Sequence, residues 1–174
     1  GTLIAGNCDA LAAARLNLNL RTADRVYIVL AEFRAESFDE LFEGVSTVRF
    51  EDYIPKNGAI TVNGKCVKSK LFSISDCQKI VKKAIATRLC KKYCVKTLPE
   101  SGAAYDVEFS IYKDAARIML NTSGAGLHKR GYRDMVGIAP IRETLAAGLV
   151  LMSDYYKDRA FVDPFCGSGT IAIE

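Results

Sequence analysis

The stretch Asp163-Pro164-Phe165-Cys166-Gly167-Ser168-Gly169-Thr170 decides the fold class of this chain. We predict a short strand over 160–163 before it and a helix that begins just after it. A strand ending in an acid, a loop with two glycines and a helix start are typical of open α/β sheets that hold a nucleotide-like ligand. The glycines remove side chains where the ligand lies against the backbone, and the helix amides favour negatively polarised groups. Asp163 can accept hydrogen bonds from a cationic or hydroxyl-bearing ligand.

Other uses of this loop can be compared on the residue pattern. A Walker phosphate loop is excluded, because no Gly-Lys-Ser/Thr follows the glycines. A dinucleotide loop stays open, since Gly167-x-Gly169-x-x-Ala172 matches GxGxxG/A, but Asp163-Pro164 is not expected at that strand exit. Cys166 as a nucleophile is the weaker interpretation, because its position in the loop requires only a small residue.

The residues before the loop alternate between helical and strand-like patterns. We predict helices over 7–20, 38–45, 75–93 and 141–152, and strands over 25–33, 59–67, 105–112 and 115–121. Ser37 with Glu40, and Ser75 with Gln78, are predicted to cap two of the helices. The small residues 121–126 predict a domain boundary. Leu3-Ile4 resembles the end of a strand, so we expect further residues before Gly1.

Positive charge is concentrated in one window of the chain. The net charge is only +4, but ten lysines and arginines fall within 61–96 and Asp76 is the acid that opposes them there. Such an excess indicates a phosphate-facing surface, with a solvated lysine face as the alternative. On the predicted helix over 75–93, Lys79, Lys82 and Lys83 lie opposite the apolar side chains.

Composition argues against several classes of protein. With 49% hydrophobic and 25% charged residues the chain is globular, and no apolar run approaches the roughly 20 residues that span a bilayer. We expect a cytoplasmic protein with reduced cysteines, because the six cysteines form no CxxC pair. Cys90 and Cys94 lack a second pair to complete a metal site, so we expect no metal. His128 is the single histidine, which leaves little material for a Ser-His-Asp triad.

The loop and several upstream segments resemble one known family. The string 163–170 is similar to the first cofactor motif of Rossmann-like S-adenosylmethionine methyltransferases, in the form found in amino-group methylases. Residues 126–133 and 139–147 look like the segment that joins a THUMP domain to the catalytic domain in bacterial RNA guanine-N2 methyltransferases, often labelled N6-adenine-specific DNA methylases. Residues 20–26, 38–45 and 68–78 are also similar, so the resemblance covers nearly the whole chain.

The resemblance implies an α/β (α+β) fold in three parts. These are a partial N-terminal ferredoxin-like domain over 1–54, a THUMP RNA-binding domain over 55–123, and a linker with the beginning of a Rossmann-like methyltransferase domain over 124–174. It also implies S-adenosylmethionine as the cofactor, structured ribosomal or transfer RNA as the partner, and guanine N2 as the target. The family's later Asn-Pro-Pro-Tyr-type motif is not in this sequence, so we name no catalytic residue and expect residues 1–174 alone to be inactive.

Two sets of candidate site residues follow. The cofactor set is Asp163, Pro164, Phe165, Gly167, Gly169 and Arg142. The RNA-binding set is Lys65, Lys68, Lys70, Lys79, Lys82, Lys83, Lys129, Arg130 and Arg133. Arg142 stands at a predicted helix start, which either meets the methionine carboxylate of the cofactor or is only a packed helix start. The basic linker either anchors the catalytic domain or clamps phosphate. A DNA adenine-N6 methylase, a tRNA guanine-N2 methyltransferase and a non-catalytic RNA-binding module remain the alternative functions.

Overall fold

The computed structural model describes residues 2–6, 8–132, 140–153, 155–156 and 158–174. The chain divides into two compact units, one made of Tyr27–Asn121 and the other of Gly1–Val26 with Thr122–Glu174.

A four-stranded sheet forms the Tyr27–Asn121 unit. Its strands are β1 (Tyr27–Arg34), β2 (Ala59–Val67), β3 (Ala104–Tyr112) and β4 (Ala115–Asn121), in the order β1-β4-β3-β2. β2 and β3 are parallel, and the other two pairs are antiparallel. The parallel pair requires a crossover, which the helix between these strands supplies. The sequence therefore predicted all four strands of this sheet, each within two residues of its observed ends.

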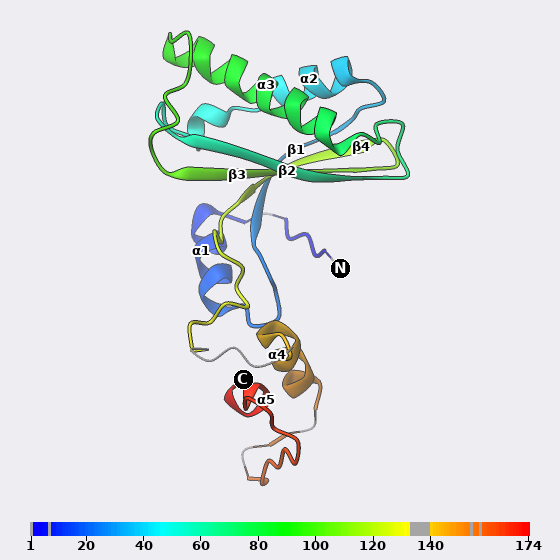
Figure 1. Ribbon diagram of the computed structural model, residues 1–174, viewed down its shortest axis with the longest axis vertical. Helices are drawn as coiled ribbons and strands as arrows, with labels where there is room; N and C mark the ends of the chain where they lie inside the picture. The colour runs from blue at the N-terminus through cyan, green and yellow to red at the C-terminus, as the bar shows by residue number, and fades with distance from the viewer. Residues whose placement is uncertain (1, 7, 133–139, 154, 157) are drawn as a thin grey trace. The chain divides into compact units, whose positions relative to one another are not determined.

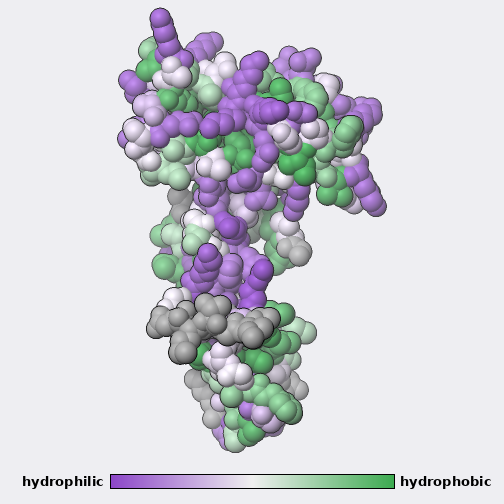
Figure 2. All heavy atoms as spheres, in the orientation of Figure 1, coloured by the Kyte–Doolittle hydropathy of each residue, from purple (hydrophilic) through white to green (hydrophobic). Residues whose placement is uncertain are grey.

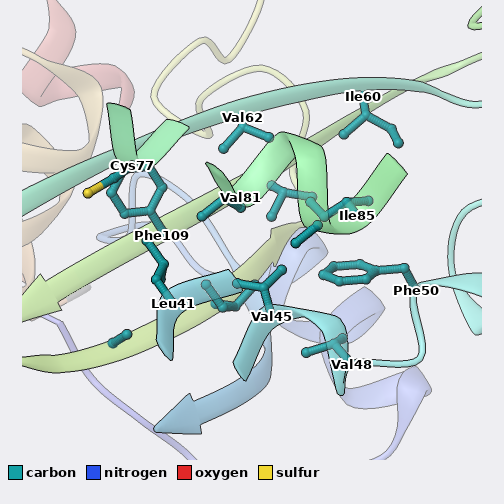
Figure 3. Close-up of a cluster of buried hydrophobic side chains, with 14 of the residues drawn as sticks. Leu41, Val45, Val48, Phe50, Ile60, Val62, Cys77, Val81, Ile85 and Phe109 are labelled. Atoms are coloured by element: carbon teal, nitrogen blue, oxygen red, sulfur yellow. The ribbon is translucent and has the colours of Figure 1, made fainter. Parts of the chain in front are cut away.

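Two helices cover one face of this sheet (Figure 1). They are α2 (Phe38–Ser46) and α3 (Ile74–Tyr93), and a 3-10 turn, η1 (Phe50–Asp52), follows α2. Figure 3 shows Leu41 and Val45 of α2, Val81 and Ile85 of α3 and Phe109 of β3 in the core between these layers. The alternating residues of β2 and β3 that point away from the helices are exposed or half-buried, so the unit has one buried and one open sheet face.

The helix caps confirm one prediction and correct another. Ser37 Oγ accepts from the amide of Glu40 at 3.2 Å, as predicted, and the Glu40 carboxylate accepts from the amide of Glu36. The prediction of Ser75 as the cap of α3 is wrong, because Ser73 holds that position and its hydroxyl donates to the carboxylate of Asp76. Gln78 instead donates to the carbonyl of Val62 at 3.1 Å, and this contact joins α3 to β2.

The second unit holds α1 (Ala10–Asn19), α4 (Glu143–Met152) and α5 (Thr170–Ile173). Its residues 122–123, within the predicted domain boundary, are held by side chains. Asn17 donates to Thr122 Oγ1 at 2.9 Å, and Ser123 Oγ accepts from the amide of Val26 at 2.8 Å. The strands predicted at 3–4 and 160–163 are not formed. A strand requires a neighbour, and the sheet pairings of the described residues all lie within Tyr27–Asn121.

The compact units group the residues differently from the three expected domains. The expected boundary at residue 54 falls inside the Tyr27–Asn121 unit, where β1 pairs with β4 and α2 packs beside α3. The division into 1–54, 55–123 and 124–174 remains a proposal about domains.

Candidate functional site

The glycine loop adopts backbone conformations that other residues disfavour. Gly167 and Gly169 have φ values of +54° and +74°, in the left-handed region. The loop is closed by hydrogen bonds from the Gly169 amide to the Cys166 carbonyl at 2.7 Å, and from the Phe165 amide to Asp163 Oδ1 at 3.1 Å. A side chain at either glycine would therefore strain this loop.

The loop also has space beside it. A Cβ atom on either glycine would meet no other described atom within 4 Å, and Phe165 is 93% exposed. Thr170, the first residue of α5, is buried, and its hydroxyl lies 3.1 Å from that of Ser168. The loop is thus held at its helix end and open along its glycines, as a backbone that receives a ligand must be.

Glu174, one helical turn after the loop, accepts hydrogen bonds from several side chains. Its side chain is 3% exposed, and its carboxylate accepts from Arg21 at 3.0 Å, Arg130 at 3.4 Å and Tyr132 at 3.0 Å. Burial alone would raise its pKa, but hydrogen bonds from Arg21 and Tyr132 and the charge of Arg130 hold that pKa below the usual value. Arg21, Arg130 and Tyr132 line a shallow, solvent-open depression of about 310 Å³ with this carboxylate. Sequence reasoning missed Glu174, because its partners are distant in the chain.

Arg142 lies at the start of α4 and contacts an acid. Its guanidinium is 3.4 Å from Asp24 Oδ2, and the Thr144 hydroxyl donates to Asp24 Oδ1 at 2.9 Å. His128 Nδ1 is 3.8 Å from the same carboxylate. These contacts favour the packed helix start, because Asp24 already neutralises the arginine. No sequence signal marked Asp24 as a site residue, because it belongs to no local motif and lies only within the segment 20–26 that resembles the family.

The basic window is opposed by more acids than the local sequence shows. Lys70 pairs with Glu36, Lys79 with Asp76 and Lys82 with Glu100. Asp76 is the acid within the window itself, and folding brings Glu36 and Glu100 from outside the window to these lysines. Exposed pairs of this kind contribute little to stability. Their acids do, however, reduce the positive potential of the surface.

Arg88 has a structural role in this unit. Its guanidinium donates to both carboxylate oxygens of Glu51 at 2.8 Å and to the carbonyl of Ser46 at 2.8 Å. The hydrogen bonds from Arg88 lower the pKa of Glu51 to about 2. The side chain joins α3 to η1 and the end of α2, and it is not available to a ligand.

Five other cations of the basic window lie toward the two ends of α3. Lys65 and Lys68 are at one end, and Lys91, Lys92 and Lys96 are at the other; all five are exposed and take part in no ion pair with a described residue. A helix of 20 residues separates the two groups by about 30 Å. Hydrophilic side chains lie over much of the α3 side of the unit in Figure 2. The structure thus places five cations of the window in two groups, with the exposed Lys83 on α3 between them.

The other predicted RNA contacts are placed as follows. Lys83 lies over the ring of Phe42 at 5.8 Å and is exposed. Lys129 is exposed, whereas Arg130 is half-buried and donates to the carbonyl of Arg21 at 2.6 Å, which favours the anchor interpretation of the linker. Arg133 lies outside the described residues.

The part of the chain that the structure describes holds neither a metal site nor a membrane span. No cluster of three or more His, Cys, Asp or Glu side chains has the arrangement of a metal site there. No described helix combines the length and the apolar character that a bilayer span requires.

Comparison with known families defines the class. The THUMP domain model matches residues 35–121, which is half of the chain, and the chain belongs to the THUMP family. The model named "RMKL-like, methyltransferase domain" matches residues 130–174, so the glycine loop lies in the start of a methyltransferase domain.

Individual relatives give a closer comparison. The chain is 56% identical over 169 residues to "Putative RNA methyltransferase YpsC" of Bacillus subtilis, covering 95% of this chain and 44% of that protein. It is 33% identical over 167 residues to "Ribosomal RNA large subunit methyltransferase K/L" of Syntrophotalea carbinolica, covering 93% of this chain and 23% of that protein. The chain therefore spans less than half the length of these curated relatives.

Solved structures share this fold. A protein from Listeria monocytogenes, described as "a predicted N6-adenine-specific DNA methylase", matches with a TM-score of 0.91 and 54% identity, over 95% of this chain and 44% of that one. SMU.472, solved in complex with SAH, matches with a TM-score of 0.86 and 45% identity, over 92% of this chain and 43% of that one.

Proposed function

We propose that the whole protein is an S-adenosylmethionine-dependent RNA methyltransferase, and that residues 1–174 supply its RNA-binding domain and its donor-binding loop. The observation that carries this proposal is the open glycine loop 163–170 inside the segment that matches a methyltransferase domain. The SMU.472 complex supports the same cofactor, because SAH is what S-adenosylmethionine becomes after it gives up its methyl group.

The cofactor would lie along the loop. Gly167 and Gly169 leave the backbone open to it, and Asp163 keeps a carboxylate oxygen beyond the one that accepts from Phe165. That oxygen suits a hydroxyl or ammonium group, and the exposed ring of Phe165, next to Pro164, offers an apolar surface for a purine. The bound cofactor supplies an electrophilic methyl group on a sulfonium. Arg142 would act by fixing the start of α4 through Asp24.

The RNA would be held by the THUMP domain and by the basic linker that follows it. The proposed contacts are Lys65, Lys68, Lys70, Lys79, Lys82, Lys83, Lys129, Arg130 and Arg133. Lysines that are exposed or in exposed pairs exchange those partners for phosphates at little cost, so affinity should fall steeply with salt. The name of the K/L relative favours ribosomal RNA, and guanine N2 as the target rests on the family resemblance.

Methyl transfer to defined nucleic acids tests the proposal. The full-length protein is incubated with methyl-labelled S-adenosylmethionine and either ribosomal RNA, transfer RNA or genomic DNA from a deletion strain, and the nucleosides are analysed by mass spectrometry. We expect N2-methylguanosine in ribosomal RNA. N6-methyladenine in DNA would instead support the activity named for the Listeria protein, and RNA binding without any transfer would support a binding module.

A further inference from the structure

Two loops at one end of the sheet are fastened to each other. The Lys70 amide donates to Asp114 Oδ1 at 2.7 Å, the Asp114 amide donates to Ser69 Oγ at 3.2 Å, and the Lys113 amide donates to the carbonyl of Val67 at 3.2 Å. The segment after β2 and the turn between β3 and β4 therefore form one ordered edge. An ordered edge loses little conformational entropy when it binds a ligand.

The acidic side chains at this edge already have hydrogen-bond or ion-pair partners within the protein. Glu36 is paired with Lys70 and Arg34, and hydrogen bonds from these two side chains hold its pKa below the usual value. The Asp114 carboxylate is used by the Lys70 amide. Lys65 and Lys68 are exposed without an ion-pair partner among the described residues, and Lys113 is exposed over the ring of Tyr112 at 5.4 Å. Positive charge is therefore what the edge presents to solvent.

An apolar ring stands out at the same edge. Phe72 is 82% exposed, although its neighbour Leu71 is buried in the core and its neighbour Ser73 caps α3. Because both neighbours are fixed, the backbone holds the Phe72 side chain outward. A buried phenylalanine contributes roughly 2 to 3 kcal/mol relative to an exposed one, so a ligand that covers this ring recovers stabilisation that the folded chain lacks.

We propose that this edge, the lysine rim, binds an unpaired stretch of RNA; the proposal rests on the proposed function. The lysine rim consists of Lys65, Lys68, Lys113 and Phe72. The three ammonium groups contact phosphates, and a base stacks on the ring of Phe72. A duplex would satisfy the lysines but not the ring, because its bases are already stacked and its deep groove is closed to side chains. Stacking of a base on an aromatic ring accepts any sequence, which suits a general RNA-binding domain.

The ring is tested by fluorescence of a single-stranded oligoribonucleotide that carries 2-aminopurine, titrated into the full-length protein. Wild type should quench the 2-aminopurine, whereas Phe72→Ala should bind about 5- to 100-fold more weakly and lose the quenching. Phe72→Tyr should retain both. Phe38→Ala is the matched control, since Phe38 is a 39% exposed phenylalanine on α2, and it should behave as wild type.

The lysines are tested by the salt dependence of the same binding. Replacing Lys65, Lys68 and Lys113 together by alanine should lower the slope of log affinity against log salt by about 2, since each phosphate contact on a single strand contributes about 0.7. Replacing Lys91, Lys92 and Lys96, the group at the other end of α3, should leave the slope unchanged. If the wild type binds RNA and the rim variants bind it equally well, the proposal that the lysine rim binds RNA is wrong, while the proposed function stands. If the wild type binds folded ribosomal RNA but not the oligoribonucleotide, the lysine rim is likewise contradicted; if it binds neither, the proposed function itself fails.

Discussion

Arg21 and Glu174 form an ion pair of 3.0 Å although 153 residues separate them in the chain. Glu174 follows α5, whose first residue comes directly after Gly169 of the glycine loop. The pair therefore links the N-terminal segment to the helix that the proposed cofactor must meet. Arg130 and Tyr132 also donate to the same carboxylate.

Replacing Glu174 by glutamine in the full-length protein should weaken binding of S-adenosylhomocysteine and lower the melting temperature. The amide keeps the shape but loses the charge that holds two arginines, a loss of about 1 to 3 kcal/mol. Calorimetric titration and thermal melting measure the two effects. Glu32→Gln is the control, because Glu32 pairs with Arg117 on an exposed surface and should change stability by about 0.5 kcal/mol or less. Equal behaviour of the two variants would contradict this role for Glu174.

The contact of Glu51 with Arg88 predicts a pH dependence of stability. The pKa of Glu51 falls from its ordinary value of 4.5 to about 2 through the hydrogen bonds from Arg88. Because the folded pKa lies below the unfolded one, the stabilisation is complete above pH 5 and is lost as the pH falls toward 2. Urea denaturation should show wild type losing more stability than Glu51→Gln between pH 5 and pH 2. Identical losses would show that this ion pair does not titrate with folding.

Cys77 should resist alkylation in the folded protein. Burial, together with the Cys66 thiol at 3.9 Å, raises the pKa of Cys77 to about 12, and the thiolate is the reactive form. Iodoacetamide at pH 8 should label the exposed Cys8, Cys94 and Cys166 first, and Cys77 only after unfolding. Peptide mapping by mass spectrometry measures the order. Because the folded pKa is raised, this thiol also contributes stability below its ordinary pKa of 9.0 that is lost as the pH rises toward 12. Rapid native labelling of Cys77 would exclude the buried arrangement.

Gly64 in β2 should not tolerate a side chain. A Cβ atom there would lie 2.5 Å from both the ring and the backbone oxygen of Phe109 on the neighbouring strand. Gly64→Ala should therefore cost about 1 to 3 kcal/mol and lower the urea midpoint. Gly6→Ala is the control, since no described atom lies within 4 Å of that position. Equal midpoints for the two variants would contradict the packing of β2 on β3.

The elements of the Tyr27–Asn121 unit were predictable because their signals are local. β2 and β4 lie at their predicted residues, since alternation of apolar residues depends only on neighbours in the chain. The cap of α3 was misplaced because Ser73 and Ser75 are both serines two residues apart, and the choice depends on Leu71 and Cys77 being buried. That information belongs to the packing and not to the local sequence.

The sequence predicted the residue types of the candidate site, but it predicted few of the contacts between them. The two glycines of the loop do adopt the left-handed conformations that a glycine pattern suggests. The acids that neutralise the basic window, Glu36, Glu51 and Glu100, were missed because they come from outside it. Asp24 and Glu174 were missed for the same reason: the partners Thr144 of Asp24 and Arg21 of Glu174 are more than one hundred residues away.

The most direct measurement of the central claim is a calorimetric titration of the full-length protein with S-adenosylhomocysteine and, separately, with NAD. The account predicts saturable binding of S-adenosylhomocysteine that Asp163→Ala weakens at least tenfold, and no binding of NAD. Binding of NAD at this loop, or binding of S-adenosylhomocysteine that is indifferent to Asp163 and to a bulky residue at Gly167, would contradict it.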